Sequence, residues 1–178
     1  MIEAVTIKVV GRARPPGAPS TDRRPVAIGT ALPKRKMLPH DLPSWAHPET
    51  VIFFITVCCT PRGENQLCKA EVATGIFESV SFRQSRGDWW VQLLLLMPDH
   101  LHMLVSFPSD KDMPTVVSQW KEFVAKNLSI RWQQNFFDHR LRTDESLRDK
   151  ADYILNNPVR RGLIARAEDW SYVWMPDR

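Results

Sequence analysis

Two apolar segments separated by a two-residue turn constrain the fold of this 178-residue chain more than any other feature. The segment from Trp89 to Met97 is followed by Pro98-Asp99, and a second segment then runs from His100 to Phe107. Short apolar stretches that are bounded by turn residues are typical of strands. A turn of this length places two strands side by side in opposite directions, so the sequence predicts an antiparallel sheet.

The remaining elements are predicted from apolar spacing and end signals. A buried strand is expected from Val51 to Cys59, and a short one from Phe136 to Leu141. Helices are expected over 65–83, from Pro114 to about Trp132, and from a cap at Thr143 to Pro158. The order strand, helix, two strands, helix, strand, helix predicts an α+β sandwich, with helices on one face of an antiparallel sheet.

The first 44 residues differ in composition from the rest of the chain. They hold eight Lys and Arg against three acidic residues, whereas residues 45–178 hold 16 basic and 17 acidic residues. Eight of the 14 prolines precede residue 49. Because proline blocks helices and strand pairing, residues 1–44 are predicted to be a mostly disordered or extended leader before a domain at 45–178. Such a basic leader suits a polyanion or acts as a solubilising arm, and both readings stay open.

Composition excludes several classes of protein. With 43% hydrophobic and 25% charged residues, the chain is neither wholly disordered nor fibrous. It contains no stretch of roughly 18 apolar residues that could span a membrane, and its start lacks the plan of a signal peptide. The three cysteines include the neighbours Cys58 and Cys59, so we expect reduced core thiols and a cytoplasmic protein.

His100 and His102 are the sharpest local feature of the second strand of the hairpin. Because strand side chains alternate, both imidazoles point to one face while Leu101 and Met103 point to the other. Neutral imidazole is a common metal ligand, so such a pair can bind one divalent ion. A pair of polar histidines on a solvated strand face is the alternative, and the spacing alone does not decide between them.

Tyr153 and Asn157 lie four residues apart in the last predicted helix and therefore share a face. A tyrosine beside an apolar stripe is most often a residue at the edge of the core. The chain has only two tyrosines, Tyr153 and Tyr172, so few phenols are available as nucleophiles.

These segments together resemble the one-tyrosine HUH transposases, in particular their REP-associated branch. His100-Leu-His102 after Met-Pro-Asp resembles the HUH motif, which is two histidines around a hydrophobic residue. The segment from Asp152 to Leu163 resembles the helix that carries the nucleophile. Further similar blocks are Trp120-Lys-Glu-Phe123, Phe136-Phe-Asp-His-Arg-Leu-Arg142 and Asp169-Trp-Ser-Tyr172. The resemblance extends over residues 45–174 in the order of the family.

The resemblance implies a ferredoxin-like HUH endonuclease fold and a metal-dependent, single-stranded DNA endonuclease and strand transferase. It makes His100 and His102 ligands of Mg²⁺ or Mn²⁺ and Tyr153 the nucleophile. Asn157 is implied as a third ligand through its side-chain oxygen, although family members with glutamine there have a longer side chain. The expected intermediate is a 5′-phosphotyrosine with a free 3′-OH. The expected substrate is DNA next to a small hairpin, and the protein is expected to act as a monomer or homodimer.

Basic residues around this site are the expected DNA contacts, with Trp120 or Trp132 as stacking surfaces. For Trp120 the apolar helix stripe favours a core position. The expected contacts are Lys121, Lys126, Arg131, His139, Arg140, Arg142, Arg160 and Arg161.

Two other functions stay open at this point. One is a catalytically inactive module, derived from a transposase, that binds single-stranded nucleic acid. The other is a metal-dependent hydrolase in which His100 and His102 activate water. Only the transposase reading predicts a covalent protein–DNA intermediate at Tyr153.

Overall fold

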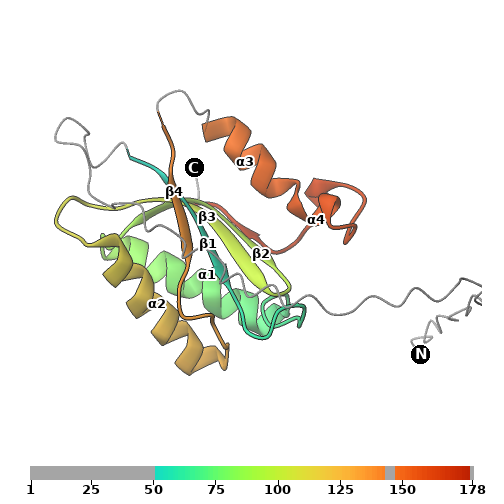
Figure 1. Cartoon of the computed structure of the whole chain (residues 1–178), viewed down its shortest axis with the longest axis horizontal. Helices are drawn as coiled ribbons and strands as arrows, with labels where there is room; N and C mark the ends of the chain where they lie inside the picture. The colour runs from blue at the N-terminus through green and yellow to red at the C-terminus, as the bar shows by residue number, and fades with distance from the viewer. Residues whose placement is uncertain (1–50, 143–146, 177–178) are drawn as a thin grey trace, which may run out of the picture. The chain divides into compact units, whose positions relative to one another are not determined.

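The structure, a computed structural model, describes residues 51–142 and 147–176. In this part of the chain five strands form one sheet in the order β4-β1-β3-β2-β5, and each neighbouring pair is antiparallel (Figure 1). The strands are β1 (Phe53–Cys58), β2 (Trp90–Met97), β3 (His100–Ser106), β4 (Phe137–Arg140) and β5 (Val173–Trp174). The predicted hairpin is β2–β3, in which Met97 lies opposite His100. The antiparallel sheet expected from the sequence is therefore confirmed.

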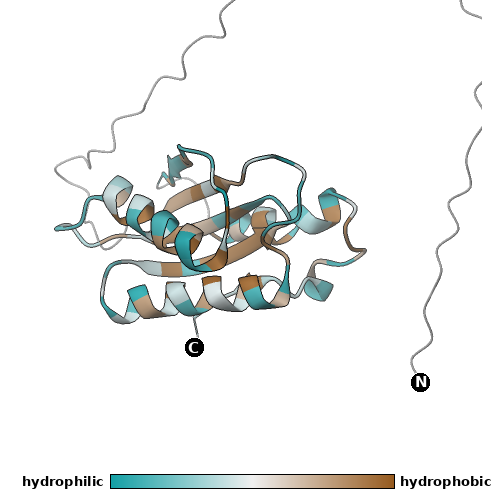
Figure 2. Cartoon of the chain, turned by 90° about the horizontal axis from the view of Figure 1, so that it is seen from below, coloured by the Kyte–Doolittle hydropathy of each residue, from teal (hydrophilic) through white to brown (hydrophobic). Residues whose placement is uncertain are grey.

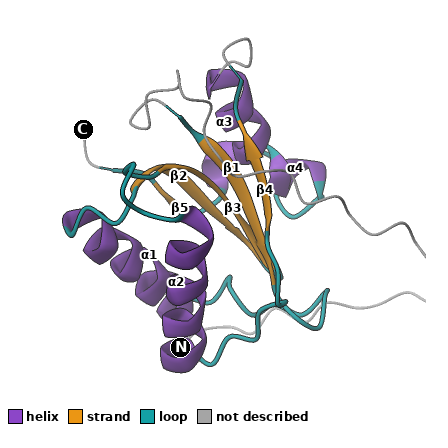
Figure 3. Cartoon of the chain, turned by 60° about the vertical axis from the view of Figure 1, so that its left-hand side comes forward, coloured by secondary structure: helices purple, strands orange, loops and turns teal. Residues whose placement is uncertain are grey.

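Two long helices, α1 (Ala70–Ser85) and α2 (Met113–Leu128), cover one face of the sheet (Figure 3). α2 begins close to Pro114, as predicted, because the side chain of Asp112 caps its first turn. It ends before the expected position, since Ser129 adopts a left-handed backbone conformation with a φ of 55°.

The first core lies between the sheet and these two helices, and it contains the side chains that strand alternation predicts. Leu101, Met103 and Val105 are fully buried on this face. Trp120 of α2 is fully buried as well, and its indole N–H donates a 2.9 Å hydrogen bond to the hydroxyl of Ser79. Trp120 is thus a core residue, as its helix stripe indicates. In Figure 2 hydrophobic residues, drawn in brown, follow the central strands, whereas the helices carry both brown and hydrophilic, teal turns.

The second core is smaller and lies on the opposite face of the sheet. α3 (Leu147–Leu155) contributes Ile154, which is fully buried among residues such as Phe54 and Leu93. α4 (Asn157–Arg160) follows directly. The expectation of helices on one face therefore describes α1 and α2, whereas α3 covers the other face (Figure 3). An apolar stripe on a nine-residue helix does not reveal which side of a sheet it contacts.

Two element ends differ from those expected. α1 begins at Ala70 because Asn65 forms an earlier turn, in which its side-chain oxygen accepts a 2.9 Å hydrogen bond from the backbone N–H of Cys68. Pro158 does not end the helical segment; it lies in the first turn of α4, where the missing N–H of proline is tolerated. The sequence contains no signal that predicts β5, which pairs with β2 through two residues only.

The basic leader (residues 1–44) and the Thr143 cap fall outside the described residues, so the division of the chain at residue 45 stays a prediction. Cys58, Cys59 and Cys68 are free, in agreement with the expected thiols. Among the helices of residues 51–142 and 147–176, none has the length and apolar character required to cross a bilayer.

Candidate active site

His100 and His102 lie side by side at the start of β3, on the sheet face that α3 covers; we call this the histidine face. Their ring centroids are 4.9 Å apart, and only 6% and 8% of the two residues is exposed. Leu101 between them points into the first core, as strand alternation requires. Because both imidazoles are buried, the reading of a solvated polar pair does not hold.

His102 is held from the neighbouring strand β1. Its Nδ1 lies 2.9 Å from Oγ1 of Thr56, and the strand register places these two residues opposite each other. The ring of Phe54 stacks on the imidazole, with centroids 5.3 Å apart and planes inclined by 28°. The hydrogen bond fixes the rotation of the imidazole and leaves Nε2 as the nitrogen that can bind a ligand.

His100 is held by the residue that precedes it. Its Nδ1 lies 2.7 Å from Oδ1 of Asp99, and because a carboxylate only accepts hydrogen bonds, Nδ1 carries the proton. The other carboxylate oxygen accepts a 2.8 Å hydrogen bond from the backbone N–H of Gly63 and forms a 3.0 Å ion pair with Nε of Arg62. Gly63 has a φ of 84°, a conformation that favours glycine. The loop after β1 thereby orients Asp99, which leaves Nε2 of His100 free of the proton.

Burial keeps both imidazoles neutral. It lowers the pKa of His102 to about 3, and the positive charges of Arg62 and Arg161 act in the same direction. Burial also lowers the pKa of His100, although the Asp99 carboxylate opposes this shift. Burial would raise the pKa of Asp99 itself, but its hydrogen bonds and the Arg62 charge outweigh that effect and lower it. Since neutral imidazole is the form that binds metal ions, the histidine pair fits a divalent ion.

Asn157 lies where α3 passes into α4. Its side-chain nitrogen donates hydrogen bonds to the backbone carbonyls of Tyr153 and Ile154, at 3.1 and 3.2 Å. These bonds occupy the amide nitrogen, so the amide oxygen is the atom suited to a cation. Within residues 51–142 and 147–176, no group of three or more His, Cys, Asp or Glu side chains is arranged to hold a metal ion. The third ligand stays a prediction.

Tyr153 lies on α3 with 45% of the residue exposed, which makes its phenol accessible. The guanidinium carbon of Arg160 lies 4.7 Å from the centroid of the tyrosine ring, and the ammonium of Lys150 lies 5.9 Å from it. The same ammonium is 5.4 Å from the ring centroid of Phe54, which stacks on His102. These contacts link the candidate nucleophile to the histidine face within one chain.

Three of the basic residues expected to contact DNA lie on or next to the histidine face. Arg160 contacts the ring of Tyr153, and the charge of Arg161 is close enough to lower the pKa values of the histidine pair. His139 of β4 lies opposite Phe54 in the strand register, and opposite residues share a face. The fold therefore brings Arg160, Arg161 and His139 toward the candidate site.

Two other expected contacts have partners within the protein. Lys121 is buried, and its ammonium donates a 2.9 Å hydrogen bond to each of the backbone carbonyls of Gln133 and Gln134. It joins α2 to the segment that leads into β4, which is a structural task. Arg131 is exposed and forms a 3.1 Å ion pair with Glu64.

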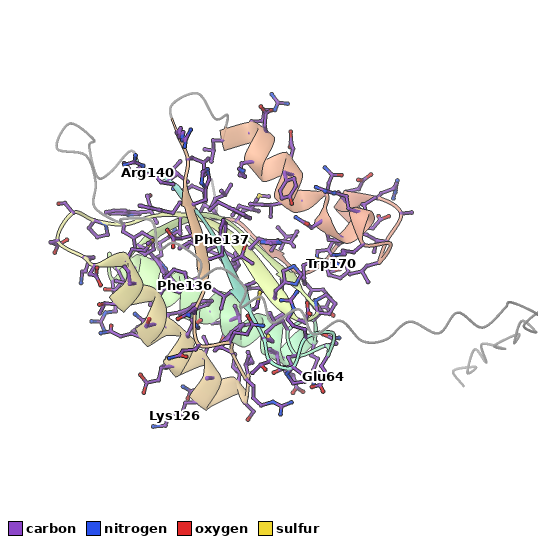
Figure 4. All side chains as sticks on the ribbon, viewed as in Figure 1. Glu64, Lys126, Phe136, Phe137, Arg140 and Trp170 are labelled. Atoms are coloured by element: carbon purple, nitrogen blue, oxygen red, sulfur yellow. The ribbon has the colours of Figure 1, made fainter. Side chains whose placement is uncertain are left out.

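The fold brings neither Lys126 nor Arg140 to the histidine face. Lys126 is exposed on α2, on the other side of the sheet from α3 (Figure 4). Arg140 lies opposite Phe53, whose side chain belongs to the first core. Arg142 is exposed just after the end of β4. Trp132 packs partly buried against the first core, so it offers less stacking surface than its sequence position indicates.

Comparison with known proteins decides the family. Residues 53–147 match the family described as Transposase IS200 like, which is more than half of the chain. The chain belongs to this transposase family. Its members are generally metal-dependent enzymes that transesterify DNA. The matched residues include His100 and His102 and end before Tyr153.

Relatives of this transposase-like chain carry the name REP-associated tyrosine transposase. One from Escherichia coli is 30% identical over 83 residues, which cover 44% of this chain and 49% of that protein. One from Haemophilus influenzae, named so provisionally, is 27% identical over 96 residues, which cover 44% of this chain and 54% of that protein. The match thus spans about half the length of each curated relative.

A solved structure of a REP-associated tyrosine transposase bound to a REP hairpin shares the fold. Its TM-score is 0.59 at 22% sequence identity, over 68% of this chain and 74% of that chain. The likeness confirms the fold class that the transposase resemblance implies.

The residues that orient the histidines are not predicted from the sequence. Thr56 and Phe54 become neighbours of His102 only through the register of β1 on β3, for which the sequence contains no signal. Asp99 is expected only as a turn residue. Its position next to His100 is nevertheless a signal that its carboxylate could orient the imidazole. Lys150 precedes Tyr153 by three residues, a spacing that brings side chains together on a helix.

Proposed function

We propose that this chain cleaves and rejoins single-stranded DNA, with Tyr153 as the nucleophile and with His100 and His102 as ligands of Mg²⁺ or Mn²⁺. The observation that carries the proposal is the arrangement of the imidazoles: each Nδ1 is within hydrogen-bond distance of a side-chain oxygen, which leaves both Nε2 atoms on the same sheet face. Membership of the transposase family supports DNA transesterification. The helix with the exposed Tyr153 covers the same face.

In the proposed step, the phenolic oxygen of Tyr153 bonds to phosphorus while the bond between phosphorus and the 3′ oxygen breaks. The phenol gives up its proton to solvent and the leaving 3′ oxygen takes up a proton. The products are a 5′-phosphotyrosine and a free 3′-OH. Because the new bond is again a phosphate ester, a 3′-OH can attack it and restore a DNA strand without ATP. A bound divalent ion supplies charge neutralisation at the phosphate.

The chain's own groups have distinct tasks in this proposal. Asp99 and Thr56 hold the histidines with Nε2 available, and the side-chain oxygen of Asn157 completes the ligand set. Arg160, Arg161 and His139 contact the DNA strand, with Arg131, Arg140 and Arg142 as more distant contacts. Lys126 is left out because it lies on α2, on the other side of the sheet from the histidine face. Lys121 is left out because its ammonium is already bound to two backbone carbonyls. The hairpin is taken from the solved relative, which is bound to a REP hairpin, and the single-stranded DNA substrate is what the resemblance to one-tyrosine HUH transposases implies.

The proposal is tested by incubating the full chain with a labelled single-stranded DNA that contains a small imperfect hairpin, in the presence of Mn²⁺. A covalent protein–DNA species should appear on a denaturing gel. Tyr153→Phe should abolish this species while DNA binding persists. Tyr172→Phe is the matched control, because Tyr172 is the only other tyrosine in the sequence, and it should leave the species in place.

Two results would overturn the proposal. Cleavage without a covalent species would indicate that water is the nucleophile, as in a metal-dependent hydrolase. Binding of the oligonucleotide with neither cleavage nor a covalent species would indicate an inactive DNA-binding module.

A further inference from the structure

Two cationic side chains flank the ring of the candidate nucleophile. Lys150 lies one helical turn before Tyr153 on α3, and Arg160 lies on the following helix α4. Their charged groups are 5.9 and 4.7 Å from the centroid of the tyrosine ring. Lys150 also reaches Phe54, at 5.4 Å from its ring centroid, and so lies between the tyrosine and the ring that stacks on His102.

These two cations lack the carboxylate partner that several other basic residues in the described part of the chain have. Arg62, Lys111, Arg131 and Arg166 each form an ion pair with an aspartate or glutamate. Lys150 and Arg160 form none with any carboxylate in residues 51–142 and 147–176, and both rest on aromatic rings instead. A cation over an aromatic face keeps its capacity to bind an anion, since the ring uses none of its N–H donors.

Positive charge also lies close to the histidines. The ammonium of Lys150 lies over the ring of Phe54, which stacks on His102, and Arg161 follows Arg160 directly at the end of α4. Positive charge therefore extends from the tyrosine to the histidine face. A phosphodiester is the anion that must occupy this space if Tyr153 attacks phosphorus.

We propose that Lys150 and Arg160 form a phosphate clamp, which holds the non-bridging oxygens of the phosphate that Tyr153 attacks. This inference rests on the proposed function and adds to it Lys150, a residue outside the family-like motifs. The ammonium acts as a point charge, whereas the planar guanidinium donates two parallel hydrogen bonds. By fixing the phosphate beside the phenol, the clamp orients the reacting atoms before any bond forms.

The clamp can be tested at the tyrosine itself, because the chain contains only two tyrosines. Full-length protein labelled with 3-fluorotyrosine should give two ¹⁹F resonances, and Tyr153→Phe identifies the one from Tyr153. The probe is the decanucleotide (dT)10, added in EDTA so that no metal ion is present and no cleavage is needed. A methylphosphonate oligonucleotide of the same sequence has no backbone charge and serves as the ligand control.

We expect (dT)10 to shift the Tyr153 resonance and the uncharged oligonucleotide to leave it in place. Lys150→Gln and Arg160→Gln should each raise the dissociation constant measured at this resonance about fivefold, with a weaker salt dependence as a phosphate contact is lost. Lys126→Gln removes an equal charge from the other side of the sheet and should leave the resonance behaviour unchanged. Lys150→Arg keeps the charge and should restore most of the affinity.

Two outcomes overturn the clamp. One is that Lys150→Gln and Arg160→Gln bind (dT)10 as Lys126→Gln does. The other is that the uncharged oligonucleotide shifts the Tyr153 resonance as strongly as (dT)10. Both are independent of the gel assay for the covalent species, so a failure of the clamp and a failure of the proposed function are distinguishable.

Discussion

The carboxylate of Asp99 lies 2.7 Å from Nδ1 of His100 and thereby fixes which imidazole nitrogen is available to a ligand. Asp99→Asn keeps the size of the side chain but removes the negative charge that pairs with Arg62. We expect the affinity for Mn²⁺ to fall about 10- to 100-fold, the usual effect of losing a partner that orients a metal-binding histidine. Isothermal titration calorimetry of the full chain with Mn²⁺ measures this change.

Asp88→Asn is the matched control for Asp99→Asn. The side chain of Asp88 is 14% exposed, as is that of Asp99, and it forms a 3.3 Å ion pair with Lys111. Its removal should leave the Mn²⁺ affinity unchanged. Equal loss in both variants would mean that the general loss of negative charge, and not the orientation of His100, sets the affinity.

The buried histidines make the stability of the metal-free protein depend on pH. In the unfolded chain an imidazole has a pKa near 6.5, whereas burial lowers the pKa of His102 in the folded chain to about 3. Between these values the unfolded state binds a proton that the folded state does not. The free energy of unfolding should therefore fall as the pH drops below about 6.5, by at most about 1.4 kcal/mol per pH unit for each such histidine.

Urea unfolding in EDTA at about pH 7.5 and about pH 5 measures this dependence. His102→Gln removes one titrating group and should flatten the curve over this range. His139→Gln, in the edge strand β4, should keep the dependence of the unaltered chain. If the urea midpoint were the same at both pH values, the imidazoles would take up protons as readily in the folded chain as in the unfolded chain, and the prediction would be wrong.

The sequence predicts the sheet of this protein better than the second layer of its site. The β2–β3 hairpin follows from two apolar runs and a two-residue turn, and the same alternation places His100 and His102 on one face. The contact between Thr56 and His102 cannot be predicted in the same way, because only the long-range register of two strands brings these residues together. β5 consists of Val173 and Trp174 alone and pairs with β2, too short a segment for any periodic pattern.

The two hydrogen bonds of Lys121 cannot be predicted from the sequence for a similar physical reason. A lysine in a helix is usually solvated, and the sequence does not show that two backbone carbonyls lie within reach of its ammonium. The side of the sheet that α3 covers is also set by tertiary contacts, since Ile154 fits an apolar surface that is visible only once the strands are paired. Local patterns therefore predict the elements, and pairing decides their neighbours.

Replacing Lys121 by methionine separates its structural role from DNA binding. Lys121→Met keeps the length of the side chain and leaves the carbonyls of Gln133 and Gln134 without their donor. We expect the free energy of unfolding to fall by about 1–3 kcal/mol, the cost of unsatisfied buried polar groups, while the affinity for single-stranded DNA stays unchanged. Urea unfolding and fluorescence anisotropy with a labelled oligonucleotide measure the two quantities.

Lys126→Met is the control for this substitution, because Lys126 is exposed on the same helix and should change the stability by less than about 0.5 kcal/mol. The structural assignment of Lys121 would be wrong if Lys121→Met weakened DNA binding while the urea midpoint stayed where it was.

Ile154 attaches the helix of the candidate nucleophile to the sheet. It is the buried residue of α3 and packs in the second core, next to the exposed Tyr153. Ile154→Ala should release α3 locally, because a helix held by one buried side chain loses most of its packing when that side chain is truncated. Hydrogen exchange should accelerate in residues 147–160 while β2 and β3 stay protected, and formation of the covalent DNA species should slow. Val124→Ala, in the first core on α2, should lower global stability without this selective acceleration. If exchange in α3 instead accelerated together with exchange in the sheet, α3 and the sheet would open as one cooperative unit, and Ile154 would not be a local anchor for Tyr153.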